Sequence, residues 1–86
     1  MLGREITIEN SAGRARVDFA CRDSSGNLQL GEAKNGPSAG LNPNQQRVYA
    51  AAQTEGARLV GGNAQNAGLP SAIGPTAVRV FKYQVE

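Results

Sequence analysis

RARVDFACRDSSGNLQLGEAK, residues Arg14–Lys34, is the stretch that decides how this chain folds. Two segments rich in aliphatic, β-branched and aromatic residues, 15–22 and 28–34, flank a polar segment at 23–27 that contains Gly. Such segments on either side of a Gly-containing turn are typical of a β-hairpin. The stretch therefore predicts two antiparallel strands joined by a tight turn.

The turn also predicts the register of this hairpin. In a three-residue loop that ends at Gly26, the glycine takes the left-handed position that closes the turn. Counting outward from the turn, Ala20 then opposes Leu30. Two residues further along, Asp18 opposes Glu32. Side chains in such positions lie about 5 Å apart at Cβ, so the two carboxylates are predicted to be neighbours.

Glu32 and Lys34 are separated by one residue, so both side chains project from the same face of their strand. Two neighbouring carboxylates repel each other unless something neutralises them. A divalent cation does so, and the Ala33 carbonyl is a candidate ligand for it beside Asp18 and Glu32. Lys34 would orient or help deprotonate a water, or stabilise charge on a phosphate. This set of residues therefore predicts a site for phosphodiester hydrolysis.

The same residues also have a simpler interpretation. An Asp, a Glu and a Lys on neighbouring strands can form a solvated ion-pair ladder that adds little to stability. The neighbouring residues favour a functional site. Strict alternation places four apolar residues on the face opposite the acids: Val17, Phe19, Cys21 and Ala33. Ala20 and Leu30 fall on the acidic face, and ionisable groups beside apolar cover are better site candidates than exposed ones.

The clearest helix start in the chain is Asn42, which is a good N-cap. Pro43 suits the first helical position, and Gln45 stands where it can complete a capping box. We expect the helix to run to about Thr54 and to stop at Gly56.

Gln45 and Tyr49 are four residues apart and lie one above the other on this helix. An amide and a phenol on one stripe can bind a phosphate, orient Lys34 or stack on a base. The structural alternative is that Gln45 serves only the capping box and that Tyr49 is half-buried packing.

The remaining segments complete the predicted fold. Arg4–Glu9 alternates apolar and polar residues and is expected to be the first strand. Arg58–Val60 is expected to be a short strand, Gly61–Pro75 a loop, and Ala77–Val85 a final strand. The first three strands are expected to form an antiparallel meander. This order predicts an α+β fold, in which a mixed sheet consists of that meander plus the later strands and one main helix packs on a face.

Composition limits the possible functions. The chain has 86 residues, no His and one Cys, and its formal charge is +2. We expect a single domain over 1–86. The absence of His excludes His-based acid–base chemistry and ordinary zinc sites, and Cys21 cannot form an internal disulfide. No apolar run is long enough to span a bilayer, so we expect a soluble domain without membrane contact.

Asp18, Glu32-Ala33-Lys34 and Gln45-xxx-Tyr49 together resemble the motif of the PD-(D/E)xK nuclease superfamily, which includes restriction endonucleases and RecB-like nucleases. The stretch Arg14–Tyr49 is similar to nuclease toxin domains at the C-termini of bacterial polymorphic toxins, such as Rhs-type and type VI secretion effectors. The resemblance is close over about half the chain and concerns only strand order elsewhere. It implies a restriction-endonuclease-like fold.

The resemblance also implies roles for these residues. Asp18 and Glu32 would be metal ligands and Lys34 the catalytic lysine. Gln45 would be an accessory catalytic residue with Tyr49 beside it. The cofactor would be Mg²⁺ or Mn²⁺, the usual substrate DNA and the partner a cognate immunity protein. The domain would be delivered from the producing bacterium into the cytoplasm of a target cell.

Phosphate contacts are expected from basic residues near the site, and Arg16, Arg22 and Arg47 are the candidates. By parity, Arg16 and Arg22 fall on the Asp18 face. The family often supplies a further acid from an N-terminal helix. Here the N-terminal acids, Glu5 and Glu9, lie in a strand-like segment, so either that helix has been cut away or this subgroup does without it.

Two functions of other classes stay open at this point. One is a nucleic-acid-binding module on the same scaffold without hydrolysis. Its binding to DNA would depend on salt and would not be affected by EDTA. The other is a protein-interaction domain that uses the long loop and the open sheet edges. Those edges also make a homodimer conceivable.

Overall fold

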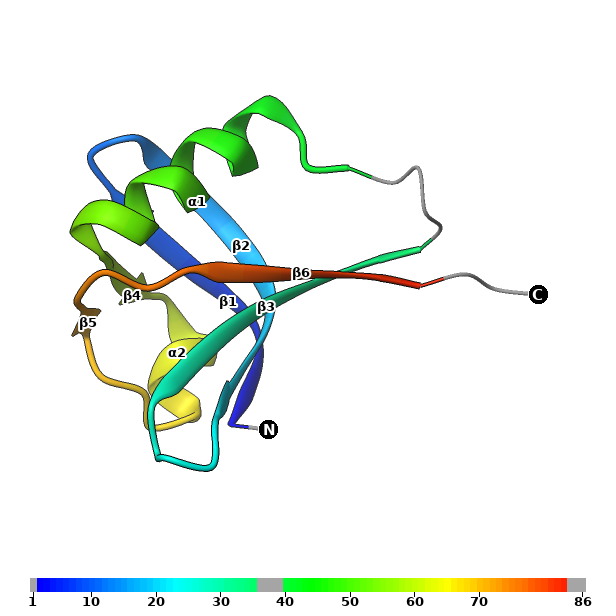
Figure 1. The fold of residues 1–86 in the computed structure, drawn as a ribbon. Coiled ribbons are helices and arrows are strands. Elements are labelled where there is room, and N and C mark those ends of the chain that lie inside the picture. Colours follow the sequence, from blue (N-terminus) through cyan, green and yellow to red (C-terminus); the bar gives the residue numbers. More distant parts are fainter. Residues whose placement is uncertain (1, 36–39, 84–86) are drawn as a thin grey trace.

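The computed structural model describes residues 2–35 and 40–83. Over these residues the chain forms a six-stranded mixed sheet in the order β5-β4-β1-β2-β3-β6, together with two helices (Figure 1). The elements are β1 (Gly3–Asn10), β2 (Gly13–Arg22), β3 (Leu28–Asn35), α1 (Pro43–Glu55), β4 (Ala57–Val60), α2 (Gly62–Asn66), β5 (Ala72–Ile73) and β6 (Val78–Tyr83). The predicted α+β class with a mixed sheet is confirmed. Within the described ranges, no helix is long and apolar enough to cross a membrane.

The first three strands form the predicted antiparallel meander. The turn between β2 and β3 closes through a 2.9 Å hydrogen bond from the Asp23 amide to the Asn27 carbonyl. Gly26 has φ +86°, the left-handed conformation expected of it. Ala20 pairs with Leu30, so the register predicted from the turn is confirmed over this part of the ladder.

The outer strands join the meander through pairings between segments that are distant in the sequence. β4 pairs antiparallel with β1, and the two-residue β5 extends that edge. At the other edge β6 runs parallel to β3, with Glu32 opposite Val80 and Ala33 opposite Phe81 (Figure 1). β3 is therefore an interior strand, held on both sides by neighbours.

Helix α1 begins and ends where the sequence predicts. Asn42 accepts a 2.7 Å hydrogen bond from the Gln45 amide, and the Gln45 side chain accepts one from the Asn42 amide, so the capping box is complete. At the other end Gly56 has φ +87° and its amide donates to the Ala52 carbonyl. Asn10 of β1 fixes the far half of the helix, because its amide group donates to the carbonyls of Val48 and Gly56.

The core lies between the sheet and the helices. Its largest fully buried side chains are Ile6, Ile8, Val17, Leu30 and Val48. Tyr49 and Ala52 complete the buried face of α1. One charged residue among those described is buried with them: Glu32, of which 4% is exposed.

The alternation of β2 breaks at Asp18 and Phe19. Val17 and Ala20 are three residues apart, yet both are 0% exposed and belong to the core. Strict alternation would put them on opposite faces. β1 is distorted at the same level, since Glu5 has φ +52° and the pairing of the two strands skips Glu5 and Asp18. The break lets two consecutive side chains of β2 leave the core face.

This break corrects three predictions. Asp18 was expected on the same face as Ala20, Leu30 and Glu32, but it leaves that face while those three are buried in the core. Val17 was expected on the same apolar face as Phe19 and Cys21, but it packs in the core. Arg16 and Arg22 were both expected on the Asp18 face. They fall on opposite faces, because Arg16 precedes the break and Arg22 follows it. The physical reason is that a distortion shared by two paired strands resets the parity of every later side chain.

The segment Gly61–Pro75 was predicted to be a loop, which is wrong in part. Residues 62–66 form α2 and 72–73 form β5. α2 has no side-chain N-cap and is only five residues long, so local sequence gives little sign of it. Its Ala64 is buried in the core, and tertiary packing therefore holds this helical turn in place.

Candidate active site

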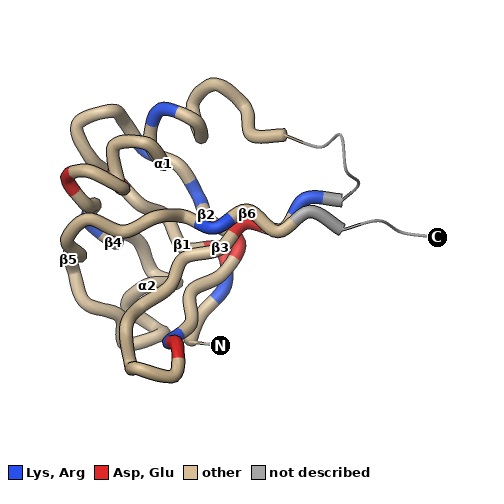
Figure 2. Tube along the Cα trace, in the orientation of Figure 1, with Lys and Arg blue, Asp and Glu red and all other residues tan. Residues whose placement is uncertain are grey.

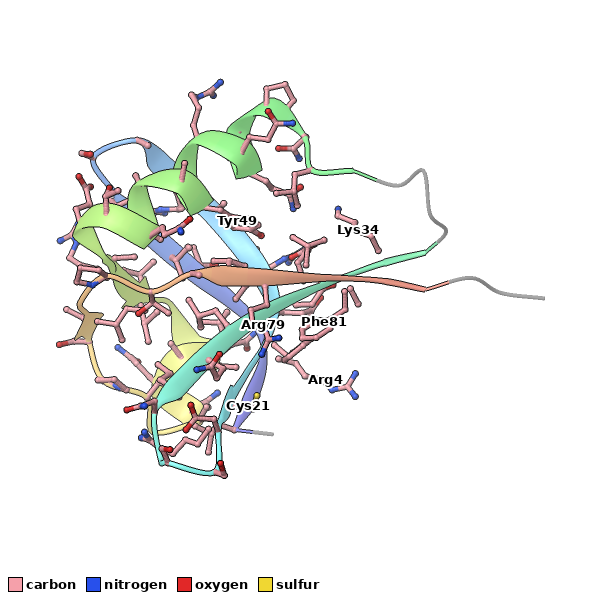
Figure 3. All side chains as sticks on the ribbon, in the orientation of Figure 1. Arg4, Cys21, Lys34, Tyr49, Arg79 and Phe81 are labelled. Carbon is pink, nitrogen blue, oxygen red and sulfur yellow. The ribbon has the colours of Figure 1, made fainter. Side chains whose placement is uncertain are left out.

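Glu32 is the centre of the site, because its buried carboxylate receives three donors. The Tyr49 hydroxyl lies 3.0 Å from Oε2. The Gln45 amide nitrogen lies 3.4 Å from Oε1, and Lys34 Nζ lies 3.5 Å from the same atom. A buried carboxylate is tolerated when its oxygens are paired in this way. Figure 3 shows Lys34 and Tyr49 on the side of the sheet that α1 covers.

The fold explains why these donors meet. Glu32 and Lys34 alternate with Ala33 on β3 and so share one face, as expected. Gln45 and Tyr49 are one turn apart on α1 and both face that strand. The capping role and the site role proposed for Gln45 are therefore compatible. Its side-chain oxygen accepts a hydrogen bond from the Asn42 amide, and its side-chain nitrogen donates one to Glu32.

Tyr49 is held in its protonated form. Only 5% of the residue is exposed, and its hydroxyl also lies 3.0 Å from the Arg16 carbonyl. Burial raises the pKa of Tyr49 well above its usual range, and the charge and hydrogen bond of Glu32 raise it further. The charge of Asp18 acts in the same direction, while the Gln45 hydrogen bond opposes it.

Asp18 reaches the site from β2 in a way that differs from the expected cross-strand pair. The β2–β3 ladder extends as far as Phe19 and Gly31, so Asp18 and Glu32 are not a ladder pair. Instead Asp18 Oδ2 accepts a 2.8 Å hydrogen bond from the Ala33 amide. That bond places the Asp18 carboxylate beside the residue that separates Glu32 from Lys34.

A groove of about 570 Å³ opens at Asp18. Its lining consists of Arg4, Glu5, Asp18, Phe19 and Ala33. Because Asp18 is exposed here while Glu32 is buried, the site has an accessible acid and an enclosed one. Figure 2 shows both acidic and basic positions on the neighbouring strands β2, β3 and β6.

The donor types at the site are those of a hard divalent cation. The atoms available on this part of β2 and β3 are carboxylate and carbonyl oxygens, the ligands that Mg²⁺ and Mn²⁺ prefer. The bond to the Ala33 amide uses one oxygen of Asp18 and orients that side chain. Within residues 2–35 and 40–83, no group of three or more Asp, Glu, Cys or His could hold a metal, so a cation here would rest on two acids and a carbonyl.

The basic residues expected to bind substrate are not gathered at the site. The Arg22 guanidinium donates to the Gly26 carbonyl at the hairpin turn. Arg16 and Arg47 are exposed, on β2 and on α1 respectively. The residue that sequence reasoning missed is Arg4, which lines the groove. The register could have indicated it, because Arg4 pairs with Phe19, next to Asp18.

No family model, no curated protein and no solved structure matches this chain.

Proposed function

We propose that this chain is a metal-dependent nuclease domain of the PD-(D/E)xK type, which hydrolyses phosphodiester bonds of DNA on a restriction-endonuclease-like fold. One observation carries the proposal. A buried Glu32 is contacted by Lys34 from its own strand and by Gln45 and Tyr49 from α1. Asp18 is anchored at Ala33, at the mouth of a groove.

Energetics favour a functional role for this cluster over a structural one. Burying a carboxylate beside a partly buried ammonium costs desolvation energy, and well-packed apolar residues of similar volume are often as stable or more so. A purely structural role for Glu32 and Lys34 gives no reason for an exposed Asp18 to be fixed beside them. A hydrolytic site needs all three groups together.

Each residue has a role in the proposed mechanism. Asp18, Glu32 and the Ala33 carbonyl would hold the cation. When bound, Mg²⁺ or Mn²⁺ would supply Lewis-acid stabilisation to the phosphate and acidify the attacking water. Lys34 orients that water or stabilises the negative charge that develops on phosphate. Gln45 holds the Glu32 carboxylate in position.

The test is cleavage of supercoiled plasmid with millimolar Mg²⁺ or Mn²⁺, with and without EDTA. We expect Glu32→Gln and Lys34→Ala to lower the rate by at least about 100-fold, the loss typical of a residue that stabilises charge in the transition state. Glu55→Gln is the matched carboxylate control, because Glu55 is fully exposed and contacts Ser11. Arg58→Ala is the matched cation control, because Arg58 pairs with Glu9 on β1.

Two outcomes would remove the assignment. One is cleavage by Lys34→Ala at the rate of the unaltered protein. The other is metal-independent cleavage that survives EDTA. Single-stranded RNA assayed in parallel tests the commitment to DNA.

We further propose that the domain acts as an antibacterial toxin that a cognate immunity protein neutralises. A nuclease acting inside a cell damages its nucleic acid, so production in a bacterial cytoplasm should arrest growth and fragment DNA. Lys34→Ala, produced to the same level, should relieve both effects. Growth arrest that Lys34→Ala leaves unchanged would separate toxicity from hydrolysis.

A further inference from the structure

An aromatic and basic surface lies on the face of the sheet opposite α1. Phe81 of β6 is 45% exposed, one of two large apolar side chains that are exposed among the described residues. Its ring stacks against Phe19 of β2, with ring centroids 5.9 Å apart and an interplanar angle of 30°. The guanidinium carbon of Arg79 lies 5.5 Å from the centroid of the Phe81 ring. Figure 3 shows Arg4, Arg79 and Phe81 on the side away from α1.

The strand pairings place these side chains in one row across the sheet. Arg4 pairs with Phe19, Phe19 with Gly31, and Gly31 with Arg79. Gly31 makes the row possible. A Cβ atom added to it would lie 2.2 Å from Cζ of Phe19, so the Phe19 ring occupies the space over the glycine. An aromatic ring therefore lies between two exposed arginines.

This row meets the proposed active site at the Asp18 groove, whereas Glu32 and Lys34 lie on the face of the sheet that α1 covers. Phe81 pairs with Ala33, whose amide binds Asp18. Phe19 lines both the groove at Asp18 and a second hollow of about 230 Å³ that also contains Arg79 and Phe81. A ligand bound at Asp18 that extends along this face would meet Phe81 and then Arg79.

We propose that this surface is a stacking platform for an unpaired base of the nucleic-acid substrate. Phe81 and Phe19 provide the rings, and Arg79 and Arg4 contact the phosphates on either side. An exposed aromatic flanked by cations is the combination that single-stranded nucleic acid requires, since every base has a π-face and every linkage a negative charge. The proposal rests on the proposed function and adds that the preferred substrate contains a single-stranded segment beside the scissile phosphate.

Binding is tested by anisotropy of a labelled oligothymidine of about eight nucleotides, a length within the usual site size, in EDTA so that no cleavage occurs. We expect Phe81→Ala to weaken binding by about 5- to 150-fold, the loss of one stacked base. Phe81→Leu keeps apolar bulk without a π-face and should also weaken it. Arg79→Gln should lower both the affinity and its dependence on salt. Arg58→Gln, the matched exposed arginine, should bind as the unaltered protein does.

A second readout reports contact directly. The chain contains no Trp, so Phe81→Trp introduces a single fluorophore at the platform. We expect this variant to keep its affinity and its emission to be quenched by the oligonucleotide, because a stacked base quenches indole. Circular dichroism of each variant verifies folding.

The outcomes separate this proposal from the nuclease itself. The platform would be overturned if Phe81→Leu bound the oligonucleotide with unaltered affinity. It would also be overturned if the oligonucleotide did not change the emission of Phe81→Trp. Either result would stand even where Lys34→Ala abolishes cleavage. If Phe81→Ala lost binding while Lys34→Ala still cleaved at the full rate, the stacking platform would be supported and the nuclease assignment would be wrong. If the Phe81 variants alter only self-association in sedimentation, the surface belongs to a second copy of the chain and the platform is wrong.

Discussion

The phenolic oxygen of Tyr49 lies 3.0 Å from Oε2 of Glu32, so one buried hydrogen bond joins the main helix to an interior strand. The same bond fixes an oxygen of the proposed metal ligand. Stability and chemistry therefore depend on one contact, and substitutions at either residue should affect both.

Tyr49→Phe should lower the free energy of unfolding by about 1.5–3 kcal/mol, the range for a hydrogen bond to a charged group. The carboxylate of Glu32 would lose a partner in a place where water cannot replace it. Urea unfolding measures the change. Thr54→Val removes an exposed hydroxyl from the same helix and should stay within about 0.5 kcal/mol. Equal stability of Tyr49→Phe and the unaltered protein would contradict the contact.

Alkaline pH should destabilise the protein through Tyr49. The folded protein keeps this phenol protonated well above its ordinary pKa, which is about 10 in an unfolded chain. Above pH 10 the unfolded chain releases the proton and the folded chain does not, so the free energy of unfolding falls as pH rises. The contribution of the protonated Tyr49 phenol to the free energy of unfolding is fully present below pH 10. Urea unfolding at several pH values measures the slope.

Two variants identify the source of that slope. Tyr49→Phe should show less loss of stability above pH 10 than the unaltered protein. Glu32→Gln removes the neighbouring charge, so the pKa of Tyr49 should fall toward its ordinary value. Identical slopes for Tyr49→Phe and the unaltered protein would show that the phenol does not contribute.

Divalent cations should stabilise the fold through Asp18 and Glu32. A cation that binds only the folded state with a Kd of about 1 mM adds about 1.4 kcal/mol at ten times that concentration. For a domain of this size such a gain raises Tm by roughly 5–10 °C. Asp18→Asn should abolish the gain, while Asp23→Asn, at the hairpin turn, should keep it. A rise that persists in Asp18→Asn would place the cation elsewhere.

Gly31→Ala should destabilise the sheet. The added methyl would meet the Phe19 ring at 2.2–2.8 Å, and overpacking of this kind costs about 1–3 kcal/mol. Gly74→Ala, where an added Cβ meets nothing within 4 Å, is the matched control. Phe19→Leu in the Gly31→Ala background should recover part of the loss, since the two positions are coupled. A neutral Gly31→Ala would mean that the ring does not lie over the glycine.

Local chemistry made much of the fold predictable. The hairpin register follows from the conformation that Gly26 must adopt, and the start of α1 follows from Asn42, Pro43 and Gln45. Each of these signals acts over a few residues. The convergence of Gln45 and Tyr49 on Glu32 also follows once the helix packs on this face of the sheet.

What the sequence left open depends on contacts between distant segments. The break at Asp18 is shared with Glu5 of the neighbouring strand, and no alternation rule applied to β2 alone reports it. Phe81 meets Phe19 only because β6 runs parallel to β3, a pairing that periodicity does not encode. Arg4, by contrast, reaches the groove through its pairing with Phe19 in the β1–β2 hairpin, a local register that could have indicated it.

The order of strands in the sheet also determines how the molecule assembles over time. β1 pairs with β4, and β3 with β6, so the partners are about 50 residues apart and the chain must close large loops before these contacts stabilise it. Domains with such distant pairings fold more slowly than helical bundles of equal length. β3 has both neighbours only after β6 docks, so the proposed catalytic strand becomes complete late in folding.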